Sequence, residues 1–418
     1  MEIKGKYLLI ILTVLAFSSC VTAENNIKVK VASRSETLLF LKNQTGETPV
    51  WSSYPVFDFN GNEVQNRMLS LIENARDYIL INSYLLMYDD YGSVILDAIF
   101  EKHKTGVRTY IIADSSNNFI PGESGFAFLN KNHIPYVEYN PIRLHTLFSG
   151  KSVIYRDHRK FWVVDGKYIY IGGCNIINSS LKPADEGGNI DGMVLFESQE
   201  TAEILIDAFT GTWNSFSDLK LDSKMFRIPE QKIFDTKVLL INQEISSNSQ
   251  RITDMISGLF SAARKEVWII QPYTFVNSDI IKSVKQMVKK GVSVNIILSE
   301  YSTSSKYYYA SFYGIKDFIK AGAVVWIYSP PLLSSPLHIK AFFVDNNWVS
   351  IGSANFNQRS FNYADEANII FYDPSSFNEI AKSLYKIKKS CWKIDMEEAK
   401  RYRTYQYRNW NRLMQIAG

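Results

Sequence analysis

Apolar runs along the chain alternate with segments of helical character, and the same order of elements occurs twice. The runs at 78–81 and 267–270 are β-branched or aromatic and each follows a polar segment, which predicts buried strands. A helical segment follows each run and stops at a glycine, the residue expected just past a helix end. The predicted elements are strands at 78–81 and 267–270, helices at 94–104 and 280–290, and strands at 107–113 and 292–298.

The repeat continues in a polar motif. His158 and Lys160 recur 180 positions later as His338 and Lys340, and an aspartate follows each histidine at the same distance. Fourteen residues after each histidine begins a stretch of small residues that leads to an asparagine. These positions are Asp165, Gly172, Gly173 and Asn175 in the first copy, and Asp345, Gly352, Ser353 and Asn355 in the second.

Such a duplication predicts an α/β fold of two similar halves, each a large sheet covered by helices, packed about a pseudo-twofold axis. We expect the first half to span residues 27–214 and the second to span 237–418. Residues 215–236 show no clear periodicity and would form the crossover between them.

Residues 1–23 are typical of an export signal rather than of the fold. Two lysines precede an apolar run at 7–17, which is shorter than the roughly 20 residues that cross a bilayer. Small residues before Glu24 would suit cleavage after Ala23, whereas the residues before Cys20 would suit cleavage that leaves Cys20 lipidated. Both routes predict an exported protein, either periplasmic or anchored as a lipoprotein.

Composition excludes several classes of protein. Hydrophobic residues make up 46% of the 418 positions and charged residues 21%, which is typical of a globular protein and not of a disordered or polytopic membrane protein. The three cysteines are too few for a disulfide framework, and nothing indicates that Cys174 pairs with Cys391. The net charge of +4 permits an anionic partner without requiring nucleic acid.

Each motif is expected to bring its histidine, lysine and asparagine side chains to one surface. His158 and Lys160 share a face because side chains alternate along a strand. The sequence at 165–167 is typical of a hairpin turn, so Asp165 and its counterpart Asp345 are expected in structural turns. The returning strand would carry Gly172, Gly173 and Asn175 back beside the histidine, where glycine would admit a ligand and the amide could donate to an oxyanion.

Two histidines, two lysines and two asparagines suit displacement at a phosphodiester without a metal or cofactor. One imidazole would attack while the other protonates the leaving group, and the lysines and amides would stabilise the phosphoryl oxygens. A carboxylate on the far ring nitrogen would orient each histidine. Asp191 and Glu366 are the candidates because each leads a downstream strand. Glu186, which lies 28 residues after His158 as Glu366 does after His338, competes with Asp191 for the support of His158.

The two motifs resemble the HxKxxxxD signature of the phospholipase D superfamily, and the resemblance covers nearly all of residues 50–418. More narrowly, residues 155–160 and 269–297 are similar to segments of bacterial cardiolipin synthases. The resemblance implies a duplicated α-β-α sandwich and a covalent phosphatidyl-histidine intermediate, with His158 as nucleophile and His338 as acid and base. Those synthases carry two N-terminal membrane helices, which we do not find here.

The resemblance predicts a monomeric enzyme that acts on phospholipid at a membrane surface of the bacterial cell envelope, by transfer to an alcohol. Hydrolysis to phosphatidic acid, a secreted nuclease and a non-catalytic binding protein are the alternatives. Separately, residues 400–412 interleave arginines with aromatic residues. That stretch could bind anionic headgroups or nucleic acid, or could be a solvated helix that docks its aromatic side chains.

Overall fold

The computed structural model describes residues 33–120, 122–141, 154–230, 232–247, 250–302, 304–330 and 335–417. The export segment expected at residues 1–23, with Cys20, lies outside them. In the described ranges, no helix combines the length and apolar character needed to cross a membrane. Cys174 and Cys391 are both free thiols.

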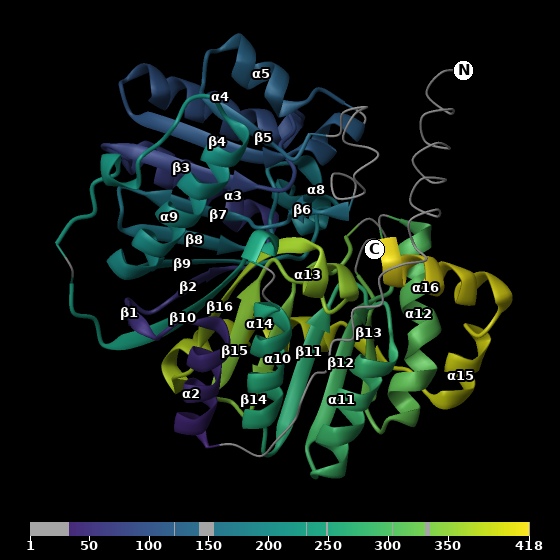
Figure 1. Ribbon diagram of the computed structural model, residues 1–418. Coiled ribbons are helices and arrows are strands. Elements are labelled where there is room, and N and C mark those ends of the chain that lie inside the picture. Colours follow the sequence, from purple (N-terminus) through teal and green to yellow (C-terminus); the bar gives the residue numbers. More distant parts are fainter. Residues whose placement is uncertain are drawn as a thin grey trace, which may run out of the picture.

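The first half is built on a seven-stranded sheet (Figure 1). Its strands, in spatial order, are β2 (Val56–Asp58), β9 (Met193–Glu197), β8 (Tyr168–Gly172), β7 (Phe161–Val164), β3 (Tyr78–Ser83), β4 (Arg108–Asp114) and β5 (Tyr136–Tyr139). Its helices are α3 (Gly61–Asn74), α4 (Asp90–Lys104), α5 (Gly125–Lys131), α8 (Asn178–Leu181) and α9 (Gln199–Phe216).

The second half is built on a ten-stranded sheet. Along its main path lie β1 (Val50–Ser52), β10 (Thr236–Gln243), β16 (Ala364–Phe371), β15 (Trp348–Gly352), β14 (Ala341–Val344), β11 (Glu266–Gln271), β12 (Ser293–Ser299), β13 (Val324–Tyr328) and β17 (Cys391–Lys393), and β6 (Arg156–Asp157) pairs with β16 off this path. The helices are α2 (Arg34–Thr45), α10 (Arg251–Ala262), α11 (Ser278–Lys289), α12 (Ser305–Lys320), α13 (Gln358–Asn362), α14 (Pro374–Lys389), α15 (Met396–Arg401) and α16 (Tyr405–Ala417).

Both sheets are buried on both faces, which explains the unbroken apolar runs in the sequence. In β3, Tyr78 and Leu80 point into a central core, while Ile79 and Ile81 point into an outer core. The central core is shared by the two sheets with α9 and α14, and the outer cores lie under α3 and α4 in one half and α10 to α12 in the other. The predicted duplicated α/β architecture is confirmed.

The two halves do not divide at the expected boundary. Residues 34–52 were assigned to the first half, yet β1 pairs antiparallel with β10 and α2 packs against α10 of the second half. Leu41 is fully buried there, and a Cβ at Gly258 would lie 2.7 Å from its Cδ2, so the glycine makes room for it. In this position β1 also covers an edge of β10 that would otherwise be open.

The aspartate that ends each motif holds a turn. Asp165 has φ 52° and Asp345 has φ 52°, the left-handed backbone of a tight hairpin. The Asp165 carboxylate accepts hydrogen bonds from the backbone N–H groups of Arg76, Asp77 and Tyr78 at 2.8, 2.8 and 2.9 Å. It thereby fixes the start of β3 to the β7–β8 hairpin.

Replacing this carboxylate should therefore destabilise the fold. We expect Asp165→Ala to lower the free energy of unfolding by about 2–4 kcal/mol, because several charge-assisted hydrogen bonds to backbone donors are lost together. Chemical denaturation followed by circular dichroism measures the change. The control is Asp185→Ala at an exposed site, which should shift the midpoint little; equal midpoints for the two variants would contradict this role.

Candidate active site

The two halves exchange backbone hydrogen bonds where the histidines lie. The short strand β6 runs parallel to the start of β16, and the His158 N–H donates to the Asp365 carbonyl at 2.9 Å. In the other half, the His338 N–H donates to the Ile190 carbonyl at 2.7 Å. The backbone of each histidine is therefore bonded to the residue just before a carboxylate of the opposite half. These carboxylates are Glu366 for His158 and Asp191 for His338.

Because of this register, each histidine pairs with the carboxylate of the opposite half. His158 Nδ1 lies 3.1 Å from Glu366 Oε1, and His338 Nδ1 lies 2.6 Å from Asp191 Oδ2. The sequence led us to expect that each carboxylate supports the histidine of its own half, and that expectation is wrong. The sequence gives each half's internal spacing, whereas the pairing depends on how the halves dock.

Glu186 has no part in this arrangement. Its carboxylate is exposed and accepts a hydrogen bond from the Tyr91 hydroxyl at 2.6 Å. Asp191, at 1% exposure, is the first-half carboxylate at the site. Neither residue supports His158, so the choice between them as its partner does not arise.

The two carboxylates are held differently. Glu366 is fully buried and accepts hydrogen bonds from the hydroxyls of Ser353 and Ser360. In the first half Gly173 stands at the position equivalent to Ser353, and a Cβ there would come within 2.2 Å of Asp191 Oδ1. The glycine thus lets Asp191 lie directly against the chain, where the Gly192 N–H donates to it at 2.9 Å.

The glycines that begin the two small-residue stretches, Gly172 and Gly352, allow neighbouring strands of each sheet to pack closely. A Cβ on Gly172 would come within 2.1 Å of the Gly192 carbonyl oxygen, and one on Gly352 within 2.3 Å of the Ala367 oxygen. The close approach is to the neighbouring strand. The sequence had suggested an approach to ligand, and for these two positions the structure gives this different reason.

Both lysines are buried beside their histidines. Lys160 and Lys340 are each 1% exposed, and their Nζ atoms donate to the carbonyl oxygens of His158 and His338. Burial lowers the pKa of Lys160 to about 7, although nearby Glu366 opposes the shift. Burial likewise lowers the pKa of Lys340, against the attraction of Asp191. Two buried lysines therefore lie beside two buried carboxylates, which balance their charge.

The histidines are kept neutral. Burial, with the adjacent Lys160, lowers the pKa of His158 to about 4, and Glu366 only partly offsets this. Burial and Lys340 lower the pKa of His338 against Asp191. For both carboxylates burial favours the protonated form, but other interactions outweigh it and their pKa values are lowered. At Asp191 these are with Lys340 and the bonded His338, and at Glu366 with the bonded His158 and then Lys160. The resting site thus holds neutral imidazoles bonded to ionised carboxylates.

The asparagines lie within the same buried region, at 6% and 5% exposure. Asn175 Oδ1 accepts from the Leu85 N–H at 3.1 Å, which leaves its amide nitrogen as a donor. Asn355 Oδ1 is buried, and no hydrogen-bond partner for it exists in the described part of the chain. A buried polar atom of this kind is costly unless a ligand satisfies it.

Tyr84 is a neighbour of the site that sequence reasoning missed. Its ring centroid lies 4.9 Å from that of His158 in an edge-on arrangement, and Lys160 Nζ lies 5.1 Å from the same ring. Tyr84 follows directly after β3, at the carboxyl end of a strand in a parallel pair with β4, where ligand sites of α/β sheets form. Its position shortly after a predicted strand was the feature of the sequence that could have identified Tyr84.

The duplicated fold, with a histidine and a lysine from each half meeting between the sheets, defines the phospholipase D superfamily of enzymes. The family described as "Cardiolipin synthase, PLD-like domain" matches residues 68–213 and 256–392, and the chain belongs to that family.

Individual relatives agree with this assignment. The chain is 24% identical over 384 residues to a cardiolipin synthase of Geobacillus sp. (strain WCH70), covering 91% of this chain and 74% of that one. It is 25% identical over 347 residues to cardiolipin synthase 2 of Bacillus anthracis, covering 81% and 64%. The crystal structure of phosphatidylserine synthase from Haemophilus influenzae Rd KW20 shares the fold, with TM-score 0.70, 15% identity and coverage of 91% and 100%.

The crowding at Gly173 allows a specific prediction. Gly173→Ala should displace the Asp191 carboxylate and so leave His338 without its partner, which we expect to lower turnover by up to about 10⁴-fold, as when the carboxylate that orients a catalytic histidine is lost. Steady-state kinetics measures the effect. Gly211→Ala, on α9 where a Cβ meets nothing within 4 Å, is the matched control and should leave turnover unchanged. Normal activity in Gly173→Ala would contradict this account.

Proposed function

We propose that the protein transfers a phosphatidyl group from a phospholipid to an alcohol through a covalent phosphatidyl-histidine. The observation that carries the proposal is the pair of neutral histidines, each bonded through Nδ1 to a carboxylate of the other half, with two buried lysines beside them. Membership of the cardiolipin synthase family supports a phospholipid as substrate.

In the first step His158 Nε2 attacks phosphorus. Its Nδ1 is engaged with Glu366, so Nε2 is the nitrogen left to react, and the low pKa keeps it unprotonated. The nitrogen–phosphorus bond forms as the bond from phosphorus to the headgroup oxygen breaks. For this step His338 takes up a proton from solvent, and Asp191 stabilises the resulting imidazolium. His338 then gives this proton to the headgroup oxygen, and the headgroup leaves as an alcohol.

In the second step the acceptor alcohol gives its proton to His338 and attacks phosphorus, and the bond to His158 breaks. The short hydrogen bond to Asp191 suits His338 to this role, because the carboxylate stabilises the imidazolium that forms. Lys160, Lys340 and the amides of Asn175 and Asn355 would stabilise the charge on the phosphoryl oxygens.

Hydrolysis differs only in the second nucleophile. We favour an alcohol because relatives that align with most of this chain are cardiolipin synthases, and the acceptor would be glycerol or the headgroup of phosphatidylglycerol. The family match does not favour the nuclease alternative.

We propose that the reaction takes place at the membrane surface of the bacterial cell envelope, which the export signal expected at 1–23 supports. We also propose that neither metal nor cofactor takes part.

The pKa shifts predict an optimum on the acid side of neutrality. Below about 4 His158 is protonated and cannot attack. As the pH rises, His338, whose pKa burial and Lys340 also lower, loses the proton that it must give to the leaving group, and above about 7 Lys160 loses the charge that stabilises the phosphoryl oxygens. The value of kcat/KM, which reports the free enzyme, should therefore be highest between these limits and fall as pH rises above 7. A pH–rate profile checks this. A steady rise of kcat/KM from pH 7 to 9 would contradict it.

The choice between transfer and hydrolysis is tested with labelled phosphatidylglycerol vesicles, supplied with and without added glycerol. Transfer requires the acceptor to be held in place, so we expect cardiolipin or exchanged phosphatidylglycerol to dominate over phosphatidic acid when the products are separated. His158→Ala serves as the inactive control. Phosphatidic acid as the sole product at every glycerol concentration would show that the enzyme is a hydrolase.

A further inference from the structure

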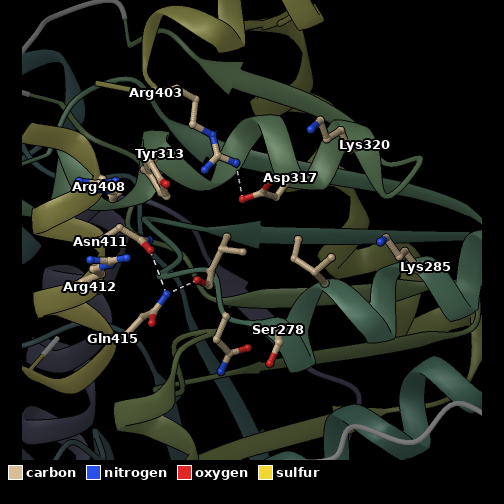
Figure 2. A pocket seen from close by; sticks show the side chains of 13 residues that line it. Ser278, Lys285, Tyr313, Asp317, Lys320, Arg403, Arg408, Asn411, Arg412 and Gln415 are labelled. Carbon is tan, nitrogen blue, oxygen red and sulfur yellow. Dashed lines mark hydrogen bonds and ion pairs between the residues drawn. The ribbon is translucent and has the colours of Figure 1, made fainter. Parts of the chain in front are cut away.

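A basic pocket lies in the second half between α11, α12 and α16, and none of its lining residues belongs to the catalytic set (Figure 2). Its cavity volume is about 510 Å³. An adjoining hollow of about 480 Å³ shares part of its wall, including Tyr313, Lys320, Arg403 and Arg408. The pocket is lined by five cationic side chains, Lys285, Lys320, Arg403, Arg408 and Arg412, and one carboxylate, Asp317.

The cations converge from separate parts of the chain. Lys285 comes from α11 and Lys320 from the end of α12, while Arg403 lies between α15 and α16 and the remaining arginines lie on α16. A single solvated helix would not gather charges in this way. Of these five cations, only Arg403 has an ion-pair partner within the described ranges, and that partner is Asp317. The excess positive charge in a concave wall favours a bound anion.

Arg403 is set up as a fixed donor at this site. Its guanidinium pairs with Asp317 and stacks 4.0 Å from the ring centroid of Tyr313. Its Nε is buried, and the described residues offer that donor no acceptor. A planar guanidinium held in place by an aromatic ring is suited to the oxygens of a phosphate group.

The helix that closes the pocket, α16, is anchored to α12 and to the segment before α11. Met414 packs with Phe275 and Ala310, and Asn411 Nδ2 donates to the Ala310 carbonyl at 2.9 Å. This docking leaves Arg408 and Arg412 exposed along the pocket. Tyr405, which lines the adjoining hollow, is 72% exposed. An exposed aromatic residue beside arginines is typical of a surface that meets a lipid interface.

We propose that this pocket binds a phosphate ester anion at a site separate from the catalytic histidines. The phosphate would be that of an anionic phospholipid headgroup, which would hold the enzyme on the membrane, or that of a soluble glycerophosphate. The experiment below distinguishes these sources. It measures binding in a His158→Ala background shared by all the proteins compared, which cannot turn phosphatidylglycerol over, so its result does not depend on whether the enzyme catalyses transfer.

The test compares the full chain with Arg408→Glu/Arg412→Glu. Sedimentation with vesicles of phosphatidylglycerol in phosphatidylcholine measures the lipid source, and calorimetry with glycerol 3-phosphate measures the soluble source. We expect the double variant to bind one of these probes at least about tenfold more weakly, since each basic residue near an anionic surface contributes to binding. With His158 intact, the double variant should cleave a soluble short-chain phosphodiester at the wild-type rate, which shows that it is folded.

Lys42→Glu/Lys131→Glu changes the net charge equally at exposed sites on α2 and α5, and it should bind like the wild type. Loss of vesicle binding confined to the pocket variant supports a lipid headgroup, and loss of glycerol 3-phosphate binding supports the soluble ester. Equal loss in both variants, no loss in either, or binding of the wild type only to a single-stranded oligonucleotide would overturn the proposal.

Discussion

The active site depends on hydrogen bonds that cross between the two halves of the molecule. His158 is held by Glu366 of the second half, and His338 by Asp191 of the first. Backbone bonds from each histidine to the residue before its partner carboxylate set this register. Neither half therefore contains a complete histidine–carboxylate pair, and docking of the two sheets over their shared core is what assembles the site.

The same crossing controls the electrostatics of the site. Two buried lysines would be costly on their own, and the two buried carboxylates compensate for them. Because burial and the lysines outweigh the carboxylates at each imidazole, both histidines are neutral in the resting site. In the proposed mechanism an incoming phosphodiester would meet a neutral nucleophile flanked by two lysines. These lysines would provide the positive charge that a metal ion supplies in other phosphoryl-transfer sites.

The sequence alone was sufficient for the fold class and for the residues of the two motifs, since both repeat at fixed spacing and the strands are unbroken apolar runs. It could not show which carboxylate serves which histidine, because that depends on the docking of two halves about 180 residues apart. It also misplaced residues 34–52, where α2 and β1 join the other half through a sheet edge. Tyr84 lies outside the motifs, and only its position directly after a strand indicated that it could lie near the site. The basic pocket needed three helices to be placed together before its cations formed one surface.

The crossed pairing is tested most directly by trapping the covalent intermediate with a phosphodiester whose leaving group departs as an anion and needs no acid. In reactions quenched with alkaline denaturant, which preserves the phosphorus–nitrogen bond, Glu366→Gln should form little phospho-histidine, because His158 has lost its carboxylate. Asp191→Asn should instead form the adduct at nearly the wild-type rate and accumulate it, because His338 can no longer activate the second nucleophile. The reverse pattern, with accumulation in Glu366→Gln and little adduct in Asp191→Asn, would contradict the account.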